Sequence, residues 1–186
     1  MFVQKKKYEE FLAALVPIAE KLKAGDPLNE ATDIGPMIRE SDAIRVEEWL
    51  DEAQNGGATV LCGGHRKGTV VEATVLTHTN PKMKVNCLEV FAPVVTVEPY
   101  DEFDEALEWI NDSLFGLQAG VFTKDATLIM KAFERIEVGG LVAGDVPTFR
   151  MDNMPYGGVK ESGLGREGVR YAIEEMTERK ILVWAV

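Results

Sequence analysis

The stretch FGLQAGVFTKDATLIMKAFERIEVGGLVAG, residues 115–144, decides the fold class. Its first part, FGLQAGVFT, is an apolar run that predicts a strand. Thr123 or Asp125 can then cap a helix. That helix is expected to place three apolar side chains on one face, those of Leu128, Ile129 and Ala132. The apolar run VGGLVAG predicts a second strand, so the stretch reads as strand, helix, strand.

The same alternation of strands and helices extends over the rest of the chain. Helical periodicity predicts helices over residues 8–22, 41–54, 101–110 and 169–176. Ser41 is the expected cap of the second, and the last is expected to bury Val169, Ala172, Ile173 and Met176. Strands are expected at residues 58–64, 69–77, 94–98 and 181–186, with a long irregular stretch at 145–164. We therefore expect an α/β protein of three layers, a mostly parallel sheet flanked by helices.

The charge balance excludes two classes of partner. The chain has 186 residues, with 20 Lys and Arg against 31 Asp and Glu, for a net charge of −11. A surface this acidic repels nucleic-acid phosphates and anionic membranes, so we expect neither as a partner. No apolar run reaches the length of a membrane-spanning helix.

Features of the N-terminus and the cysteines indicate a cytoplasmic protein. Three lysines precede the apolar stretch FLAALVPIA, as in a secretion signal, but Glu9 and Glu10 interrupt the transition and no small-residue cleavage site follows. The two cysteines, Cys62 and Cys87, have no histidine at metal-ligand spacing and fit reduced thiols. We expect no metal site.

Gly163, Gly165 and Gly168 form the pattern G-x-G-x-x-G ahead of the last expected helix. In a dinucleotide-binding fold this pattern follows a strand, and an acidic residue about 20 residues further on holds the ribose. Here the preceding residues, RMDNMPYGGVK, are rich in Gly and Pro, and no acid closes a strand-helix-strand unit. We therefore interpret the glycines as conformational, allowing positive φ or close backbone approach in a loop that opens a helix.

Four longer motifs are more specific. MPYGGVKESGLGREG, residues 154–168, closely resembles the C-terminal signature of the aldehyde dehydrogenase superfamily, P-[FY]-G-G-x-K-x-S-G-x-G-R-E. Three further stretches resemble segments of the same family: GDPLNEATDIGPMI (residues 25–38), LEVFAPVV (88–95) and NDSLFGLQAGVFTKD (111–125). Their order and spacing agree with the family's, and the resemblance covers essentially the whole chain.

The resemblance implies an NAD- or NADP-dependent enzyme that oxidises a small aldehyde to a carboxylate through a thioester on a cysteine. Family members are much longer, so we expect residues 1–178 to be the C-terminal part of the catalytic domain and this chain to be a piece of a longer one. Residues 179–186 resemble the terminal strand that pairs with a neighbouring subunit, which implies a homodimer or homotetramer. The family's G-Q-x-C nucleophile segment and its general-base glutamate do not occur here, so we expect no catalytic residue and no activity from this chain alone.

The resemblance also assigns four binding residues. It implies that Glu89 accepts hydrogen bonds from the nicotinamide ribose, since a carboxylate has two acceptor oxygens that suit a vicinal diol. It implies that the Phe91 ring packs against the nicotinamide, with most of the cofactor held by the missing domain. Phe149 and Tyr156 would line part of an apolar substrate tunnel. The alternatives are an ordinary solvated glutamate for Glu89 and core packing for the three aromatic residues.

Several alternatives remain open at this stage. Arg150 is a candidate anchor for an anionic substrate but equally an ordinary surface residue, so it is left out of the predicted site. Cys62 and Cys87 are expected to be small buried side chains, because no His, Lys or Arg adjoins them to activate a thiolate. The whole protein could instead be a natural short interaction module of the same fold, or a family member that transfers the acyl group to coenzyme A.

Overall fold

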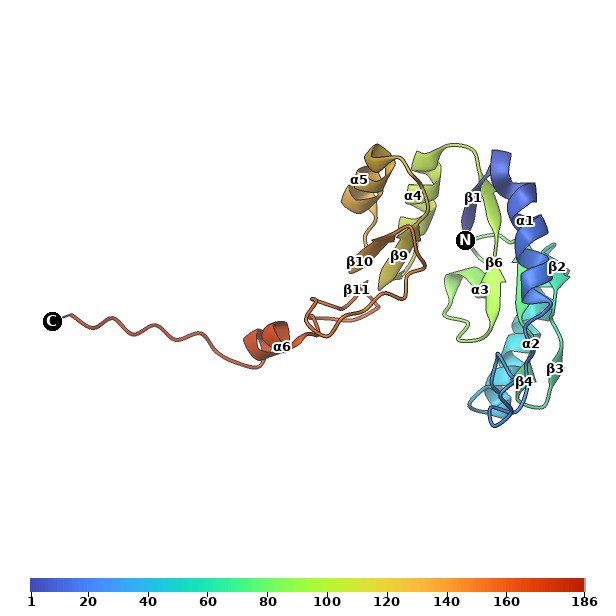
Figure 1. Cartoon of the computed structure of the whole chain (residues 1–186), viewed down its shortest axis with the longest axis horizontal. Helices are drawn as coiled ribbons and strands as arrows, with labels where there is room; N and C mark the ends of the chain where they lie inside the picture. Colours follow the sequence, from blue (N-terminus) through green and yellow to red (C-terminus); the bar gives the residue numbers. More distant parts are fainter. Residues whose placement is uncertain (186) are drawn as a thin grey trace. The chain divides into compact units, whose positions relative to one another are not determined.

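The computed structural model describes residues 1–185 of the chain (Figure 1). It divides into two compact units, unit 1 (Met1–Phe103) and unit 2 (Asp104–Val186), and each is described by itself. The predicted α/β class is confirmed, because helices and strands alternate and three of the strand pairs are parallel.

Unit 1 contains a three-stranded sheet in the order β2-β5-β6, formed by β2 (Thr59–Cys62), β5 (Thr74–Thr77) and β6 (Val94–Thr96). The central strand β5 is antiparallel to β2 and parallel to β6. Two further pairs complete the strands of this unit: β1 (Phe2–Gln4) with β7 (Glu98–Tyr100), in parallel, and β3 (Arg66–Lys67) with β4 (Val70–Val71), antiparallel.

Helices cover both faces of this sheet. The helices of unit 1 are α1 (Lys5–Ala19), α2 (Glu40–Asn55) and the short α3 (Lys84–Cys87). Successive residues of a strand point to opposite faces. Accordingly Leu76 of β5 is buried in a core with α2, whereas its neighbour Val75 is buried in a second core with α1. The Tyr8 hydroxyl of α1 is hydrogen-bonded to the Thr77 hydroxyl and donates to the carbonyl of Val97. Unit 1 therefore has the predicted layering of helix, sheet and helix.

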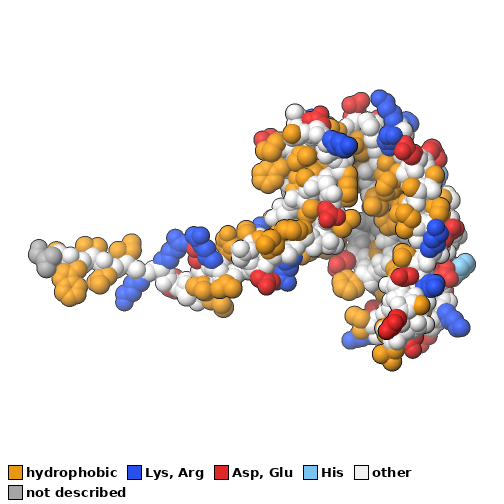
Figure 2. Space-filling view, viewed as in Figure 1, with side chains coloured by type: hydrophobic (Ala, Val, Ile, Leu, Met, Phe, Trp, Pro, Cys, Tyr) orange, Lys and Arg blue, Asp and Glu red, His pale blue; other side chains and the backbone are white. Residues whose placement is uncertain are grey.

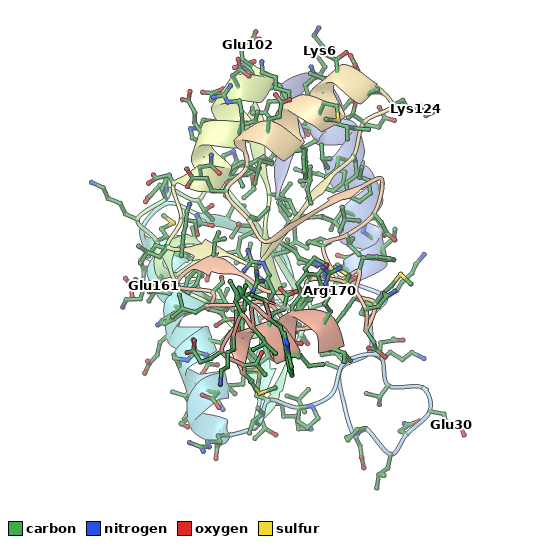
Figure 3. All side chains as sticks on the ribbon, turned by 90° about the vertical axis from the view of Figure 1, so that its left-hand side faces the viewer. Lys6, Glu30, Glu102, Lys124, Glu161 and Arg170 are labelled. Atoms are coloured by element: carbon green, nitrogen blue, oxygen red, sulfur yellow. The ribbon has the colours of Figure 1, made fainter. Side chains whose placement is uncertain are left out.

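A long loop, residues 20–39, joins α1 to α2 and contains the GDPLNEATDIGPMI motif. A bridge between Ala24 and Ile34 closes its base, where the Gly25 amide donates to the Ile34 carbonyl at 2.9 Å. Figure 3 shows Glu30 at the outer tip of this loop.

Unit 2 is built on the strand-helix-strand stretch from which the fold class was predicted. Strands β9 (Gln118–Val121) and β10 (Gly140–Ala143) pair in parallel, and α5 (Ala126–Arg135) connects them. Asp125 is the helix cap, as expected, because its Oδ1 accepts from the amides of Thr127 at 2.8 Å and Leu128 at 3.4 Å. The other elements are α4 (Phe103–Asn111), the antiparallel pair β8 (Phe115–Gly116) and β11 (Val159–Lys160), and α6 (Val169–Glu175).

Three local predictions are corrected by the structure. Ser41 is not a cap but lies inside α2, which begins at Glu40 after Arg39. The run at 69–77 is two strands, β4 and β5, and the run at 94–98 divides into β6 and β7 around the buried Val97. Both runs carry continuous β-branched sequence, which favours strand but does not show where the chain changes partner.

The burial predicted for the last helix is also wrong. None of Val169, Ala172, Ile173 and Met176 is buried, and three of them are more than half exposed. An apolar helix face predicts packing against another apolar surface. Within the described part of this chain, no residue of α6 is buried in such a contact.

After α6 the chain runs on to residue 185 without helix or strand (Figure 1). Its apolar side chains, those of Ile181, Leu182, Val183 and Trp184, are each at least 78% exposed. Figure 2 shows apolar side chains at the surface of this C-terminal stretch. Pairing of residues 179–186 with a neighbouring subunit stays a prediction, and Val186 lies outside the described residues. Among residues 1–185 no helix is both long and apolar enough to span a bilayer.

Candidate functional site

The segment between α3 and β6, residues 88–93, presents the two predicted cofactor residues to solvent. Glu89 is exposed and the Phe91 ring is 70% exposed. Val90 between them is half-buried and packs on the α2 core. The alternative of core packing for Phe91 is therefore wrong, and both side chains are available to a ligand in this chain.

Phe91 also has an unusual backbone conformation. Its φ is +52°, in the left-handed region that bulky residues rarely adopt. Such residues persist where the surroundings hold them, and they concentrate at binding and catalytic sites. Sequence reasoning missed this feature, because nothing in LEVFAPVV marks a phenylalanine for positive φ.

The chemistry of this segment fits the nicotinamide end of a dinucleotide. Within residues 1–185 the Glu89 carboxylate takes part in no hydrogen bond or ion pair, so both of its oxygens are free to accept hydroxyl protons. The exposed Phe91 ring two residues on offers a flat apolar surface to an aromatic ring. A carboxylate beside an exposed ring is a suitable pair for a ribose and its attached base.

The second predicted pair, Phe149 and Tyr156, lies in unit 2, and Arg150, which follows Phe149 in the chain, contacts Tyr156. The carbonyl of Phe149 accepts from Gln118 Nε2 of β9 at 2.9 Å, and its ring is 53% exposed. The Arg150 guanidinium lies over the half-buried Tyr156 ring, 5.2 Å from its centroid. Arg150 Nη2 also donates to Glu167 Oε2 at 2.7 Å, and the Glu167 amide donates to the Tyr156 carbonyl at 2.6 Å.

Sequence reasoning left out two residues of this cluster, Arg150 and Gln118. A polar Gln118 inside the apolar run FGLQAGVF was a usable signal, because a buried strand tolerates such a side chain only with a partner. Arg150 gave no such signal, since arginines in irregular stretches are mostly solvated. Its guanidinium has five N–H groups and half of its side chain is exposed, so it retains donors for an anion.

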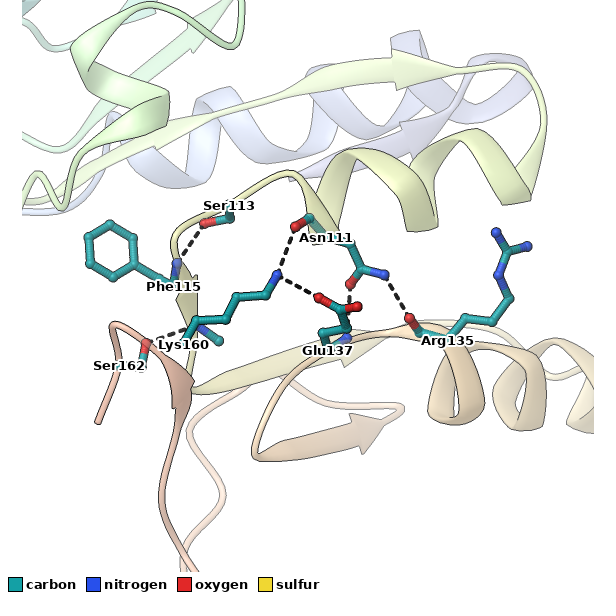
Figure 4. A network of polar contacts seen from close by, with 8 residues as sticks. Asn111, Ser113, Phe115, Arg135, Glu137, Lys160 and Ser162 are labelled. Atoms are coloured by element: carbon teal, nitrogen blue, oxygen red, sulfur yellow. Dashed lines mark hydrogen bonds and ion pairs between the residues drawn. The ribbon is translucent and has the colours of Figure 1, made fainter. Parts of the chain in front are cut away.

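Lys160 and Ser162 of the 154–168 signature bond to other segments of unit 2 (Figure 4). Lys160 Nζ donates to the Asn111 carbonyl at 2.7 Å and pairs with Glu137 at 3.0 Å. The Ser162 hydroxyl accepts from the Gly116 amide at 2.9 Å. The signature is thereby tied to α4, to β8 and to the loop before β10.

The glycines of the signature have the conformations that were expected of them. Gly163, Gly165 and Gly168 have φ of +135°, +74° and +101°. The nearby Arg166 guanidinium donates to the carbonyls of Gly158 and Gly165. These residues form a folded turn ahead of α6, as the conformational interpretation requires.

The cysteines form no nucleophile assembly. Cys62 is buried in the α1 core, and burial raises the pKa of its thiol, which keeps it protonated. Cys87 was expected to be buried, but it is exposed at the end of α3 with its thiol directed to the Lys82 carbonyl. Among residues 1–185 no three His, Cys, Asp or Glu side chains are arranged to bind a metal.

Known proteins resemble this chain in sequence and in fold. Residues 1–182 match the sequence model of the Aldehyde dehydrogenase family. The chain is 51% identical over 183 residues to a 3-sulfolactaldehyde dehydrogenase of Priestia aryabhattai. These aligned residues make up 98% of this chain and 38% of that protein. It therefore spans well under half the length of that relative.

Two solved structures are similar over nearly all of the chain. Aldehyde dehydrogenase 21 of Physcomitrella patens, in complex with its reaction product succinate, has a TM-score of 0.95 at 43% identity, covering 98% of this chain and 38% of that one. A glyceraldehyde-3-phosphate dehydrogenase of Methanocaldococcus jannaschii, complexed with NADP, has a TM-score of 0.90 at 39% identity, covering 94% and 38%.

Proposed function

Because the chain belongs to the aldehyde dehydrogenase family, we propose that it is the C-terminal portion of an NAD- or NADP-dependent enzyme that oxidises an aldehyde to a carboxylate. The family match over residues 1–182 carries the proposal. In the whole enzyme a cysteine thioester would form and be hydrolysed by groups outside these 186 residues. This chain would supply binding residues only, and alone it would be inactive.

The proposed roles follow from the exposed groups of the two units. When bound, the nicotinamide cofactor would accept the hydride from the substrate. Glu89 would accept hydrogen bonds from its ribose, and Phe91 would cover one face of the nicotinamide ring. Phe149 and Tyr156 would form part of the wall of the substrate tunnel. Homodimer or homotetramer formation through residues 179–186, in the cytoplasm, belongs to the same proposal.

We further propose that the aldehyde carries an acidic group. The three relatives described above are named for or bound to a sulfonate, a dicarboxylate and a phosphate compound. In this chain Arg150 follows Phe149 in sequence and lies over the Tyr156 ring, with donors left for an anion. An arginine is suited to this task because its planar guanidinium binds two oxygens of a carboxylate, sulfonate or phosphate at once.

The test is a steady-state assay of the whole enzyme, following reduction of NAD and of NADP with an acidic aldehyde and with a neutral aldehyde of equal length. We expect Arg150→Met to raise the KM of the acidic aldehyde about tenfold or more, the effect of losing one charged hydrogen bond. The KM of the neutral aldehyde should stay unchanged. Arg170→Met is the matched control, because Arg170 is an exposed arginine of the same unit paired only with Glu174 among the described residues.

Other outcomes would overturn parts of the proposal. If Arg150→Met raises the KM of both aldehydes equally, Arg150 does not recognise the acidic group of the substrate. Turnover that requires coenzyme A would make the enzyme an acylating member of the family. Absence of a longer protein in the source cells would favour the short interaction module. Aldehyde oxidation by the 186-residue chain itself would contradict its proposed inactivity.

A further inference from the structure

An arginine of α2 contacts the backbone of the proposed cofactor segment. Arg45 Nη2 donates to the carbonyl of Val90 at 2.9 Å, across 45 positions of sequence. Val90 is the residue between Glu89 and Phe91. The bond is half-buried, so water competes with it less than at the surface.

The arginine is itself held in place by its own helix. The Arg45 guanidinium lies over the Trp49 ring, 4.5 Å from the centroid. The two residues are four apart and so share a face of α2. Trp49 packs on the α2 core, as does Val90. The cation–π contact therefore orients a flexible arginine toward one carbonyl of an irregular segment.

This contact lies where the segment needs support. Residues 88–93 belong to no helix or strand, and Phe91 is in the left-handed region. Backbone hydrogen bonds hold the two ends of the segment. The Leu88 amide donates to the Lys84 carbonyl at 3.1 Å, and at the other end the Thr74 amide donates to the Pro93 carbonyl at 2.8 Å and the Val94 amide to the Ala92 carbonyl at 2.7 Å. Arg45 contacts the peptide between these ends, immediately before Phe91.

We propose that Arg45, oriented by Trp49, is a positioning residue for cofactor binding. It holds the Val90–Phe91 peptide so that the Glu89 carboxylate and the Phe91 ring are presented together, and it touches neither the cofactor nor the substrate. The inference rests on the proposed function, because it concerns the same two residues. Without this bond, rotation about the φ and ψ bonds that flank the planar peptide would let Glu89 and Phe91 move independently, and binding would then include the entropy of ordering them.

The first experiment measures the dissociation constant of NAD and NADP in the whole enzyme. Arg45→Met keeps the apolar stem and removes the donors, and we expect about tenfold weaker binding, the loss of one charged hydrogen bond. Arg45→Lys keeps a charged donor and should retain part of the cofactor affinity. Arg66→Met is the control: Arg66 is also partly buried and bonded to α2, but its hydrogen bonds and ion pairs are with Glu40, Glu47 and the Gly68 carbonyl. It should leave cofactor affinity unchanged.

A double-mutant cycle separates positioning from general destabilisation. If Arg45 acts through Glu89, then Arg45→Met adds little to the loss already caused by Glu89→Gln. Additive losses would overturn the inference, as would normal affinity in Arg45→Met beside weakened affinity in Glu89→Gln. If Glu89→Gln leaves cofactor affinity unchanged, the proposed role of Glu89 fails, and the inference about Arg45 fails with it. If Glu89→Gln weakens affinity and Arg45→Met does not, only the inference about Arg45 fails.

The second experiment needs no cofactor. Chymotrypsin cleaves after exposed phenylalanines, and in the 186-residue chain we expect cleavage after Phe91 to be about tenfold faster in Arg45→Met, because the segment opens more often. Mass spectrometry of the fragments identifies the site. Equal cleavage after Phe91 in the wild type, Arg45→Met and Arg66→Met would show that Arg45 does not hold the segment.

Discussion

Replacement of Lys160 by methionine tests whether the signature motif stabilises the fold. Lys160 Nζ donates to the Asn111 carbonyl at 2.7 Å and pairs with Glu137 at 3.0 Å (Figure 4). Asn111 in turn uses its side chain to bond the Arg135 carbonyl and the Glu137 amide. Methionine has a similar length but no donor, so it removes both Lys160 contacts while keeping most of the packing.

The expected loss follows from the burial of each contact. A hydrogen bond from a charged donor contributes about 1.5–3 kcal/mol. The Glu137 side chain is 63% exposed, so its ion pair adds only about 0.5 kcal/mol. We therefore expect Lys160→Met to lower the free energy of unfolding by about 2–3.5 kcal/mol.

Urea unfolding followed by Trp109 fluorescence provides the measurement. Trp109 lies in α4, two residues before Asn111, and Trp49→Phe with Trp184→Phe makes it the only tryptophan. Lys124→Met removes an exposed lysine of the same unit and controls for charge. The reasoning is refuted if Lys160→Met is no less stable than Lys124→Met.

Three further predictions concern single side chains. Asp125→Ala should lower the stability of the chain by about 1 kcal/mol in the same urea assay, because α5 loses the cap of two amides; an unchanged midpoint would contradict this. The hydrogen bond from Lys131 lowers the pKa of Asp104 below its usual value, so its stabilisation is complete above about pH 4 and is lost as the pH falls through the folded-state pKa. The stability difference between wild type and Asp104→Asn should therefore shrink on acidification, and a constant difference would argue against the pair. A thiol reagent should modify Cys87 in the native chain and Cys62 only after unfolding; two fast thiols would mean that the α1 core opens readily.

Local patterns were sufficient to predict the fold class and much of unit 2. The strand-helix-strand order of β9, α5 and β10 follows from hydrophobic period, and the Asp125 cap requires only residues two and three positions away. Periodicity also gave an apolar face to α6, but it could not show that the helix has no buried residue within the described part of the chain.

Residues of the candidate sites were predicted only where they fall within a motif that resembles the family's. Glu89 and Phe91 were assigned by resemblance, and the structure adds that both are exposed. Arg45 and Arg150 were not assigned, because their partners are 45 and 17 positions away and a lone arginine has no local pattern. The left-handed φ of Phe91 likewise depends on tertiary contacts, since the intrinsic preference of phenylalanine opposes it.

Aldehydes damage proteins because they condense with lysine amines to form Schiff bases. Lys6 and Lys124 are exposed to this chemistry at the surface (Figure 3). The Lys160 side chain is 24% exposed and its ammonium group donates to a carbonyl and a carboxylate. Treatment with an aldehyde and borohydride should therefore label Lys6 and Lys124 well before Lys160 in a peptide map, and simultaneous labelling would disprove this protection. The contacts that stabilise the signature would thus also make its lysine resistant to carbonyl stress.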